Sequence, residues 1–146
     1  MDYKIGRILI SQEELHSRIK EIGSEIRKRY TGKQLICVCV LKGAVVFLAD
    51  LIREIGPEVD VQIDFLAISS YGASTKSSGV VKIQKDLSSD IHGKHVLIVE
   101  DIIDTGNTLY HLIEYLQKDN PKSVKLCTLF DKPERREKEV PVDWVG

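Results

Sequence analysis

The chain has 146 residues, a formal net charge of -1, and a composition that is 42% hydrophobic and 29% charged. This length and balance predict one globular domain that is long enough to bury a hydrophobic core. The near-neutral charge gives no reason to expect nucleic acid or an anionic membrane as a partner. The N-terminus lacks the pattern of a signal peptide, and no run of about 20 apolar residues predicts a transmembrane helix. We therefore expect a single domain over residues 1–146, located in the cytoplasm.

The three cysteines all lie in apolar runs, at positions 37, 39 and 127. An odd number of cysteines inside predicted strands does not indicate a disulfide framework. Cys37 and Cys39 could form a metal-binding pair, but no other Cys or His stands at ligand spacing. Small, buried, reduced side chains are the favoured interpretation, and reduced cysteines fit a cytoplasmic protein.

The predicted elements alternate between helices and strands. Ser11 and Glu14 form a capping box, and apolar residues then recur at helical spacing as far as Gly32. Further helices are predicted over 44–55 and 108–118, and strands over 35–41, 59–68, 80–83, 96–99 and 124–130. This alternation predicts an α/β fold, with a mostly parallel central sheet flanked by helices on both faces. The apolar face of the helix over 44–55 would pack in the core or form a subunit interface, and the core is favoured.

Ligands of such sheets bind beyond the carboxyl ends of the strands, where the most informative segment is 100–108. Two adjacent carboxylates, Glu100 and Asp101, follow an apolar strand, and a turn of small residues then opens a helix. Free N–H groups at a helix start are suited to holding a phosphate, and Gly106 allows the backbone to come close to it. The spacing is not that of a Walker P-loop. A ribose and a hard cation would account for carboxylates beside a phosphate site.

The sequence VLIVEDIIDTGNT at 96–108 resembles the phosphoribosyl pyrophosphate motif of type I phosphoribosyltransferases, in the form carried by the hypoxanthine-guanine branch. The alternative is that these carboxylates only cap a helix and solvate a strand end. The resemblance implies a purine salvage enzyme that uses Mg²⁺ and transfers phosphoribosyl from phosphoribosyl pyrophosphate to hypoxanthine or guanine, giving IMP or GMP. It implies Asp104 as general base, and Glu100 and Asp101 at the ribose and Mg²⁺. The implied 5′-phosphate ligands are Thr105, Gly106, Asn107 and Thr108.

Other segments match this family in the same order along the chain. Leu41-Lys42-Gly43 resembles the pyrophosphate loop, in which the Leu-Lys peptide can be cis, and Arg136 aligns with an arginine near the pyrophosphate. Ser70 and Tyr71 begin a small polar segment that resembles the lid over the active site. Lys132 resembles the lysine that reads the 6-oxo group, since an ammonium donor would face the amino donor of adenine unfavourably. The rest of the charged run over 134–139 is expected to be solvated.

The resemblance also contains departures and leaves alternatives. The family continues past Val-Asp-Trp-Val-Gly with a base-stacking segment, whereas this sequence stops at Gly146, so a truncated hood is expected. Trp144 is expected to pack that hood rather than to stack on the base. Asn107 stands where relatives often carry Lys. Family membership implies a homodimer or homotetramer, while a nucleic-acid-binding regulator and an enzyme for another base are the competing functions.

Overall fold

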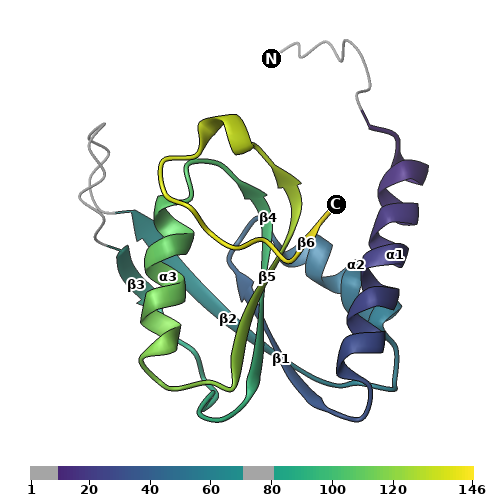
Figure 1. The fold of residues 1–146 in the computed structure, drawn as a ribbon, viewed down its shortest axis with the longest axis horizontal. Coiled ribbons are helices and arrows are strands. Elements are labelled where there is room, and N and C mark those ends of the chain that lie inside the picture. Colours follow the sequence, from purple (N-terminus) through teal and green to yellow (C-terminus); the bar gives the residue numbers. More distant parts are fainter. Residues whose placement is uncertain (1–9, 71–80) are drawn as a thin grey trace.

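The computed structural model describes residues 10–70 and 81–146, which form a six-stranded sheet with helices on both faces (Figure 1). The strand order is β3-β2-β1-β4-β5-β6. Neighbouring strands are parallel, except that β3 runs antiparallel to β2 at one edge. The predicted α/β architecture is confirmed. In chain order the elements are α1 (Gln12–Tyr30), β1 (Gln34–Val40), α2 (Val45–Ile55), β2 (Asp60–Ser70), β3 (Val81–Lys85), β4 (His95–Ile103), α3 (Asn107–Gln117), β5 (Ser123–Asp131), the 3-10 turn η1 (Pro133–Arg135) and β6 (Trp144–Val145).

Local sequence explains where the helices begin and end. The predicted capping box is present: the Ser11 hydroxyl accepts the Glu14 N–H at 3.1 Å, and the Glu14 carboxylate accepts the Ser11 N–H at 3.4 Å. Gly56 ends α2 with a φ of 79°, a value that favours glycine. No helix within 10–70 and 81–146 is long and apolar enough to cross a membrane.

The sheet separates two hydrophobic clusters. One packs α1 and α2 against the first face, and the other packs α3 against the opposite face. The three cysteines are buried and free, and burial raises the pKa of Cys37 and Cys127 to about 12. Their interpretation as small core residues is confirmed. On α2, Phe47, Leu48 and Leu51 are also buried, as the core interpretation of that helix predicted.

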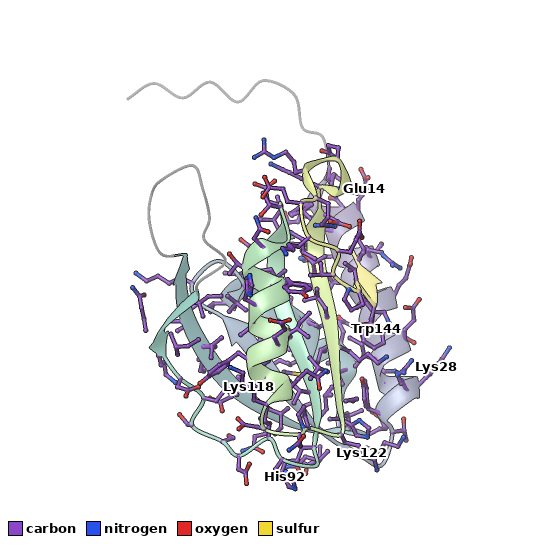
Figure 2. The ribbon with its side chains drawn as sticks, turned by 60° about the vertical axis from the view of Figure 1, so that its left-hand side comes forward. Glu14, Lys28, His92, Lys118, Lys122 and Trp144 are labelled. Carbon is purple, nitrogen blue, oxygen red and sulfur yellow. The ribbon has the colours of Figure 1, made fainter. Side chains whose placement is uncertain are left out.

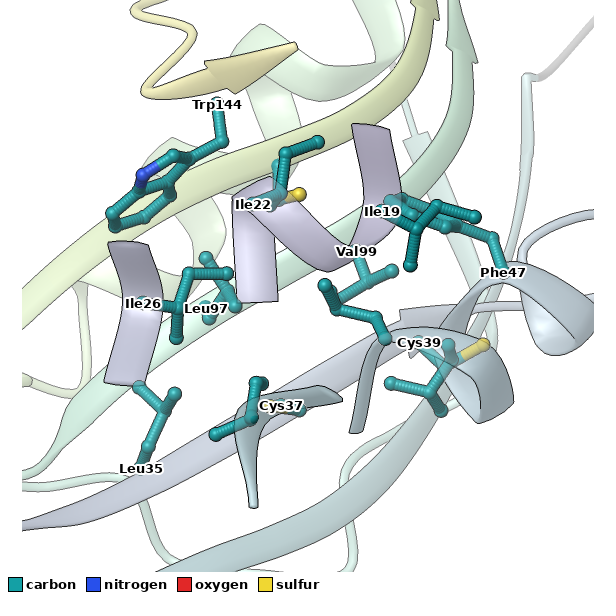
Figure 3. Close-up of a cluster of buried hydrophobic side chains, with 14 of the residues drawn as sticks. Ile19, Ile22, Ile26, Leu35, Cys37, Cys39, Phe47, Leu97, Val99 and Trp144 are labelled. Atoms are coloured by element: carbon teal, nitrogen blue, oxygen red, sulfur yellow. The ribbon is translucent and has the colours of Figure 1, made fainter. Parts of the chain in front are cut away.

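Trp144 corrects one prediction. It was expected to pack a hood over the strand ends, but it lies in β6 and is only 8% exposed, within the cluster between α1 and the sheet (Figure 3). Its ring lies 6.4 Å from that of Tyr30, centroid to centroid, and Arg29 lies over it at 6.0 Å. The last described residues therefore complete the sheet edge, because β6 pairs with Cys127 and Thr128 of β5.

The two ends of the sheet differ in chemistry. Lysines directly precede β1, β4 and β5 at their amino ends, at positions 33, 94 and 122. Figure 2 shows Lys122 and His92 together at this end of the molecule, with η1 at the opposite end. At the carboxyl ends of the strands there are instead carboxylates and small residues, among them Glu100, Asp101 and Gly106.

Candidate active site

A cleft of about 370 Å³ opens at the carboxyl ends of β1 and β4. This is the edge at which parallel sheets bind ligands. The predicted site residues in its lining are Gly43, Glu100, Asp101, Asp104, Thr105, Gly106 and Thr108. Lys42, Asn107, Lys132 and Arg136 are not part of this lining. Tyr71 lies outside the described residues. Ser70 ends β2, where its backbone pairs with Val81 of β3.

The acidic pair lies inside β4, which corrects its predicted position. The sequence indicated a strand that ended at Val99, with the carboxylates in the loop beyond. In the structure β4 continues to Ile103, because β5 is long enough to pair with it as far as Asp131. The side chains of Glu100 and Asp101 are consequently held by a paired strand rather than by a free loop.

Glu100 and Asp101 share a crowded, partly buried corner. The Asp101 N–H donates to the Glu100 carboxylate at 2.9 Å, and the Ile102 N–H donates to the Asp101 carboxylate at 2.7 Å. Burial, followed by the Asp101 side chain, raises the pKa of Glu100 to about 8, and the backbone N–H of Asp101 offsets only part of this rise. A cation or hydroxyl donor in the cleft would relieve this crowding of acceptors.

Gly43 makes room for that pair. A Cβ at this position would lie 2.3 Å from Oδ2 of Asp101, closer than any real contact. The preceding peptide, Leu41-Lys42, is cis, as the resemblance implied. Lys42 is exposed at the end of β1. The turn after β1 therefore approaches Asp101 closely at Gly43, and a larger residue there would require the Asp101 side chain to move.

The segment between β4 and α3 has the geometry of an anion site. Gly106 caps α3 with a φ of 85°, and the helix begins at Asn107. The N–H groups of a first helical turn have no partners within the helix, so they point outward with a partial positive charge. The hydroxyls of Thr105 and Thr108 flank them, and both residues line the cleft.

A second segment, residues 131–138, packs against this loop. The Lys132 N–H donates to the carbonyl of Ile103 at 2.9 Å, and the carbonyl of Thr105 accepts from the N–H groups of Glu137 and Lys138 at 2.7 and 3.1 Å. A Cβ on Gly106 would lie 2.4 Å from the Lys138 carbonyl oxygen. Gly106 is thus required twice, for its φ and for this close approach.

The charged run is exposed at Glu134, Arg135 and 137–139, as the solvated interpretation predicted, but some of its side chains also reach the loop. Arg135 Nε donates to Oδ1 of Asp104 at 2.9 Å, and the Asn107 amide donates to the Glu137 carboxylate. Arg136 donates to the Asp131 carboxylate and, at 3.0 Å, to the carbonyl of Asp104. Sequence reasoning gave no site role to Arg135 or Glu137, and it named Asp131 only as the start of the segment that carries Lys132. Arg135 and Glu137 bond to residues 31 and 30 positions away, and no local pattern marks such pairs.

The match to known proteins agrees with this geometry. Residues 11–146 match the family model of the phosphoribosyl transferase domain, which is the class that the sheet and the cleft define. The hypoxanthine phosphoribosyltransferase of Haemophilus influenzae is 50% identical over 142 residues, which cover 95% of this chain and 78% of that protein. The hypoxanthine-guanine phosphoribosyltransferase of Streptococcus thermophilus is 46% identical, covering 99% of this chain and 79% of that protein.

Solved structures give the same result. A crystal structure of a hypoxanthine-guanine phosphoribosyltransferase from Bacillus anthracis superposes with a TM-score of 0.92 at 44% identity, covering 99% of this chain and 84% of that one. The chain belongs to the hypoxanthine-guanine phosphoribosyltransferase family.

Proposed function

We propose that this chain transfers the 5-phosphoribosyl group of phosphoribosyl pyrophosphate to N9 of hypoxanthine or guanine, releasing pyrophosphate and forming IMP or GMP. Relatives of 44–50% identity carry the names of this activity. The proposal rests mainly on one observation. The acidic pair, Asp104 and the turn at the start of α3 all line the same cleft.

The 5′-phosphate is assigned to the start of α3. Thr105, Gly106, Asn107 and Thr108 offer backbone N–H groups, and the two threonines add hydroxyl donors. The side-chain amide of Asn107 donates to Glu137 and its backbone N–H donates to the Thr105 hydroxyl at 3.3 Å, so contact with the phosphate would require one of these bonds to open. Gly106 caps α3 in the αL conformation, and Thr105, Gly106 and Thr108 line the cleft.

Glu100 and Asp101 are assigned to the ribose hydroxyls and to Mg²⁺. Each carboxylate accepts a backbone N–H on one oxygen, and both residues line the cleft. Among the described residues no group of three or more His, Cys, Asp or Glu side chains gathers as a metal site. Two carboxylates fit Mg²⁺, which commonly completes its octahedron with water and substrate oxygens. When bound, the ion would neutralise charge on the pyrophosphate as it leaves.

The chemistry requires positioning more than a nucleophile. The transition state would carry positive charge on the ribose, which the surrounding carboxylates would stabilise. The purine must also be held with N9 facing the ribose. Asp104 is assigned as the general base that accepts the proton from N7. Lys132 would donate to the 6-oxo group. Its exposed side chain would have to reach the base from the segment that packs on Ile103. Ser70 and Tyr71 are assigned to a lid that excludes water as the competing acceptor.

Pyrophosphate is assigned to Lys42, Gly43 and Arg136. Lys42 is exposed at the mouth of the cleft, and Gly43 lines it. The guanidinium of Arg136 is engaged with Asp131 and the Asp104 carbonyl. Contact with pyrophosphate would therefore use its remaining N–H donors or require these bonds to open.

The test is nucleotide formation with phosphoribosyl pyrophosphate and Mg²⁺, with hypoxanthine, guanine, xanthine and adenine assayed separately. We expect turnover with at least one oxopurine, none with adenine, and loss of turnover when EDTA removes the metal. Turnover with adenine would contradict the role of Lys132. Absence of turnover with every base would overturn the proposed activity.

A further inference from the structure

The Asp104 carboxylate is held by a side chain that the sequence did not single out. Arg135, the last residue of η1, directs its Nε at Oδ1 of Asp104 with a separation of 2.9 Å. Within the described residues, Oδ2 of Asp104 accepts no hydrogen bond. One oxygen of the proposed base is therefore fixed, and the other is left to meet a ligand in the cleft that Asp104 lines.

The backbone holds Arg135 in this place. Its N–H donates to the Lys132 carbonyl at 3.0 Å, which closes the 3-10 turn, and the following residues bond to the carbonyl of Thr105. Arg136 adds a bond to the carbonyl of Asp104 itself. Backbone hydrogen bonds therefore hold η1 to the loop that carries Asp104, both before and after Arg135 in the chain. The ion pair joins two segments that are already held together.

We propose that Arg135 is a positioning residue, which orients the Asp104 carboxylate so that Oδ2 faces the N7 proton of the purine. This inference rests on the proposed function and on Asp104 as its base. The planar guanidinium favours one carboxylate orientation because its N–H donors lie in a fixed plane. A lysine would supply the charge without that geometry. A carboxylate tethered only at its backbone would sample other rotamers and lose alignment with the proton.

Two other roles for Arg135 make different predictions. If Arg135 bound phosphate or pyrophosphate directly, its removal would raise the KM for phosphoribosyl pyrophosphate. If the ion pair blocked Asp104 in the free chain, its removal would raise kcat or kcat/KM for the base. Positioning instead predicts a lower kcat with an unchanged KM for phosphoribosyl pyrophosphate.

The experiment compares kcat and both KM values of wild type, Arg135→Ala and Arg135→Lys, after wild-type turnover with an oxopurine has been established. We expect kcat to fall about tenfold in Arg135→Ala, with the lysine variant intermediate and the KM for phosphoribosyl pyrophosphate within about twofold of wild type. The matched control is Arg53→Ala. It removes another exposed arginine, paired with Asp50 at 3.6 Å on α2, and should leave kcat unchanged.

A double-mutant cycle with Asp104→Asn tests whether Arg135 acts through Asp104. We expect Arg135→Ala to lower kcat far less in the Asp104→Asn background than in wild type. Equal losses in both backgrounds, a raised KM for phosphoribosyl pyrophosphate, or a rise in kcat would each overturn the proposal. The ion pair is exposed and contributes little to stability, so the melting temperature should shift by less than about 3 °C. Inactive wild type with every base would refute the proposed activity, and this inference with it.

Discussion

Two carboxylates in this chain, the buried Asp64 and the partly buried Glu100, have pKa values that their surroundings shift in opposite directions. Asp64, on β2, is 3% exposed and accepts backbone N–H bonds from Phe65, Ser88 and Ser89 at 2.8–3.2 Å. Burial raises the pKa of Asp64, but these bonds outweigh it and hold the pKa below its ordinary value. At Glu100, burial and the neighbouring Asp101 together raise the pKa to about 8.

The difference separates a structural charge from one that awaits a ligand. Asp64 accepts its hydrogen bonds from Phe65, Ser88 and Ser89. These bonds tie the segment after β3 to the middle of β2. Glu100 has one backbone bond and a second carboxylate beside it, so its ionised form is incompletely satisfied without a partner from outside. Replacing each carboxylate by its isosteric amide should therefore have a different consequence at each site.

The largest effect on turnover is expected at Asp104, the proposed general base. Asp104→Asn keeps the shape but removes the proton acceptor, so turnover should fall by roughly 10²-fold or more while the fold and phosphoribosyl pyrophosphate binding persist. Steady-state kinetics with hypoxanthine and calorimetric titration with phosphoribosyl pyrophosphate measure the two quantities. Asp119→Asn, in the loop before β5 at the opposite end of the sheet, is the matched control. Undiminished turnover in Asp104→Asn would remove this residue from the role of base.

Asp64→Asn should reverse that pattern, with activity kept and stability lost. The amide cannot accept all of the N–H groups that converge on Asp64, so the free energy of unfolding should drop by about 2 kcal/mol at pH 7. Urea unfolding measures the loss. The pKa of Asp64 is lower in the folded state than in the unfolded one. Its contribution is therefore complete above the ordinary aspartate pKa of about 4 and is lost as pH falls through the folded pKa. Wild type and variant should converge in stability at low pH. A constant difference down to pH 2 would contradict this assignment.

These contrasts show what the sequence could predict and what it could not. The motif at 96–108, the capping box at Ser11 and the alternation of elements are local patterns. The capping box and the alternation were confirmed by the structure, and the family that the motif indicated was confirmed by the relatives, while the ligand roles of the motif stay predictions. The length of β4, the position of Trp144 in the core and the contacts of Arg135 and Glu137 depend on partners far away in sequence. Nothing in the sequence singled out Asp64, because most of the N–H groups that its carboxylate accepts come from Ser88 and Ser89. Pairings of this kind are set by the packed structure rather than by spacing along the chain.

Glu100→Gln should change how the stability of the chain depends on pH. The folded pKa of Glu100, about 8, lies above the ordinary value of 4.5, so the folded chain binds a proton that the unfolded chain has released. In EDTA, wild-type stability should therefore decline between about pH 5 and pH 8, by at most about 1.4 kcal/mol per pH unit for this one proton. Glutamine does not titrate, so the variant should lack that decline and equal or exceed wild type at pH 8. It should also need more Mg²⁺ and phosphoribosyl pyrophosphate for half-maximal turnover, by about tenfold, because a proposed ligand is gone. Identical pH slopes in the two proteins would mean that Glu100 ionises normally, and that the contrast with Asp64 lies in geometry alone.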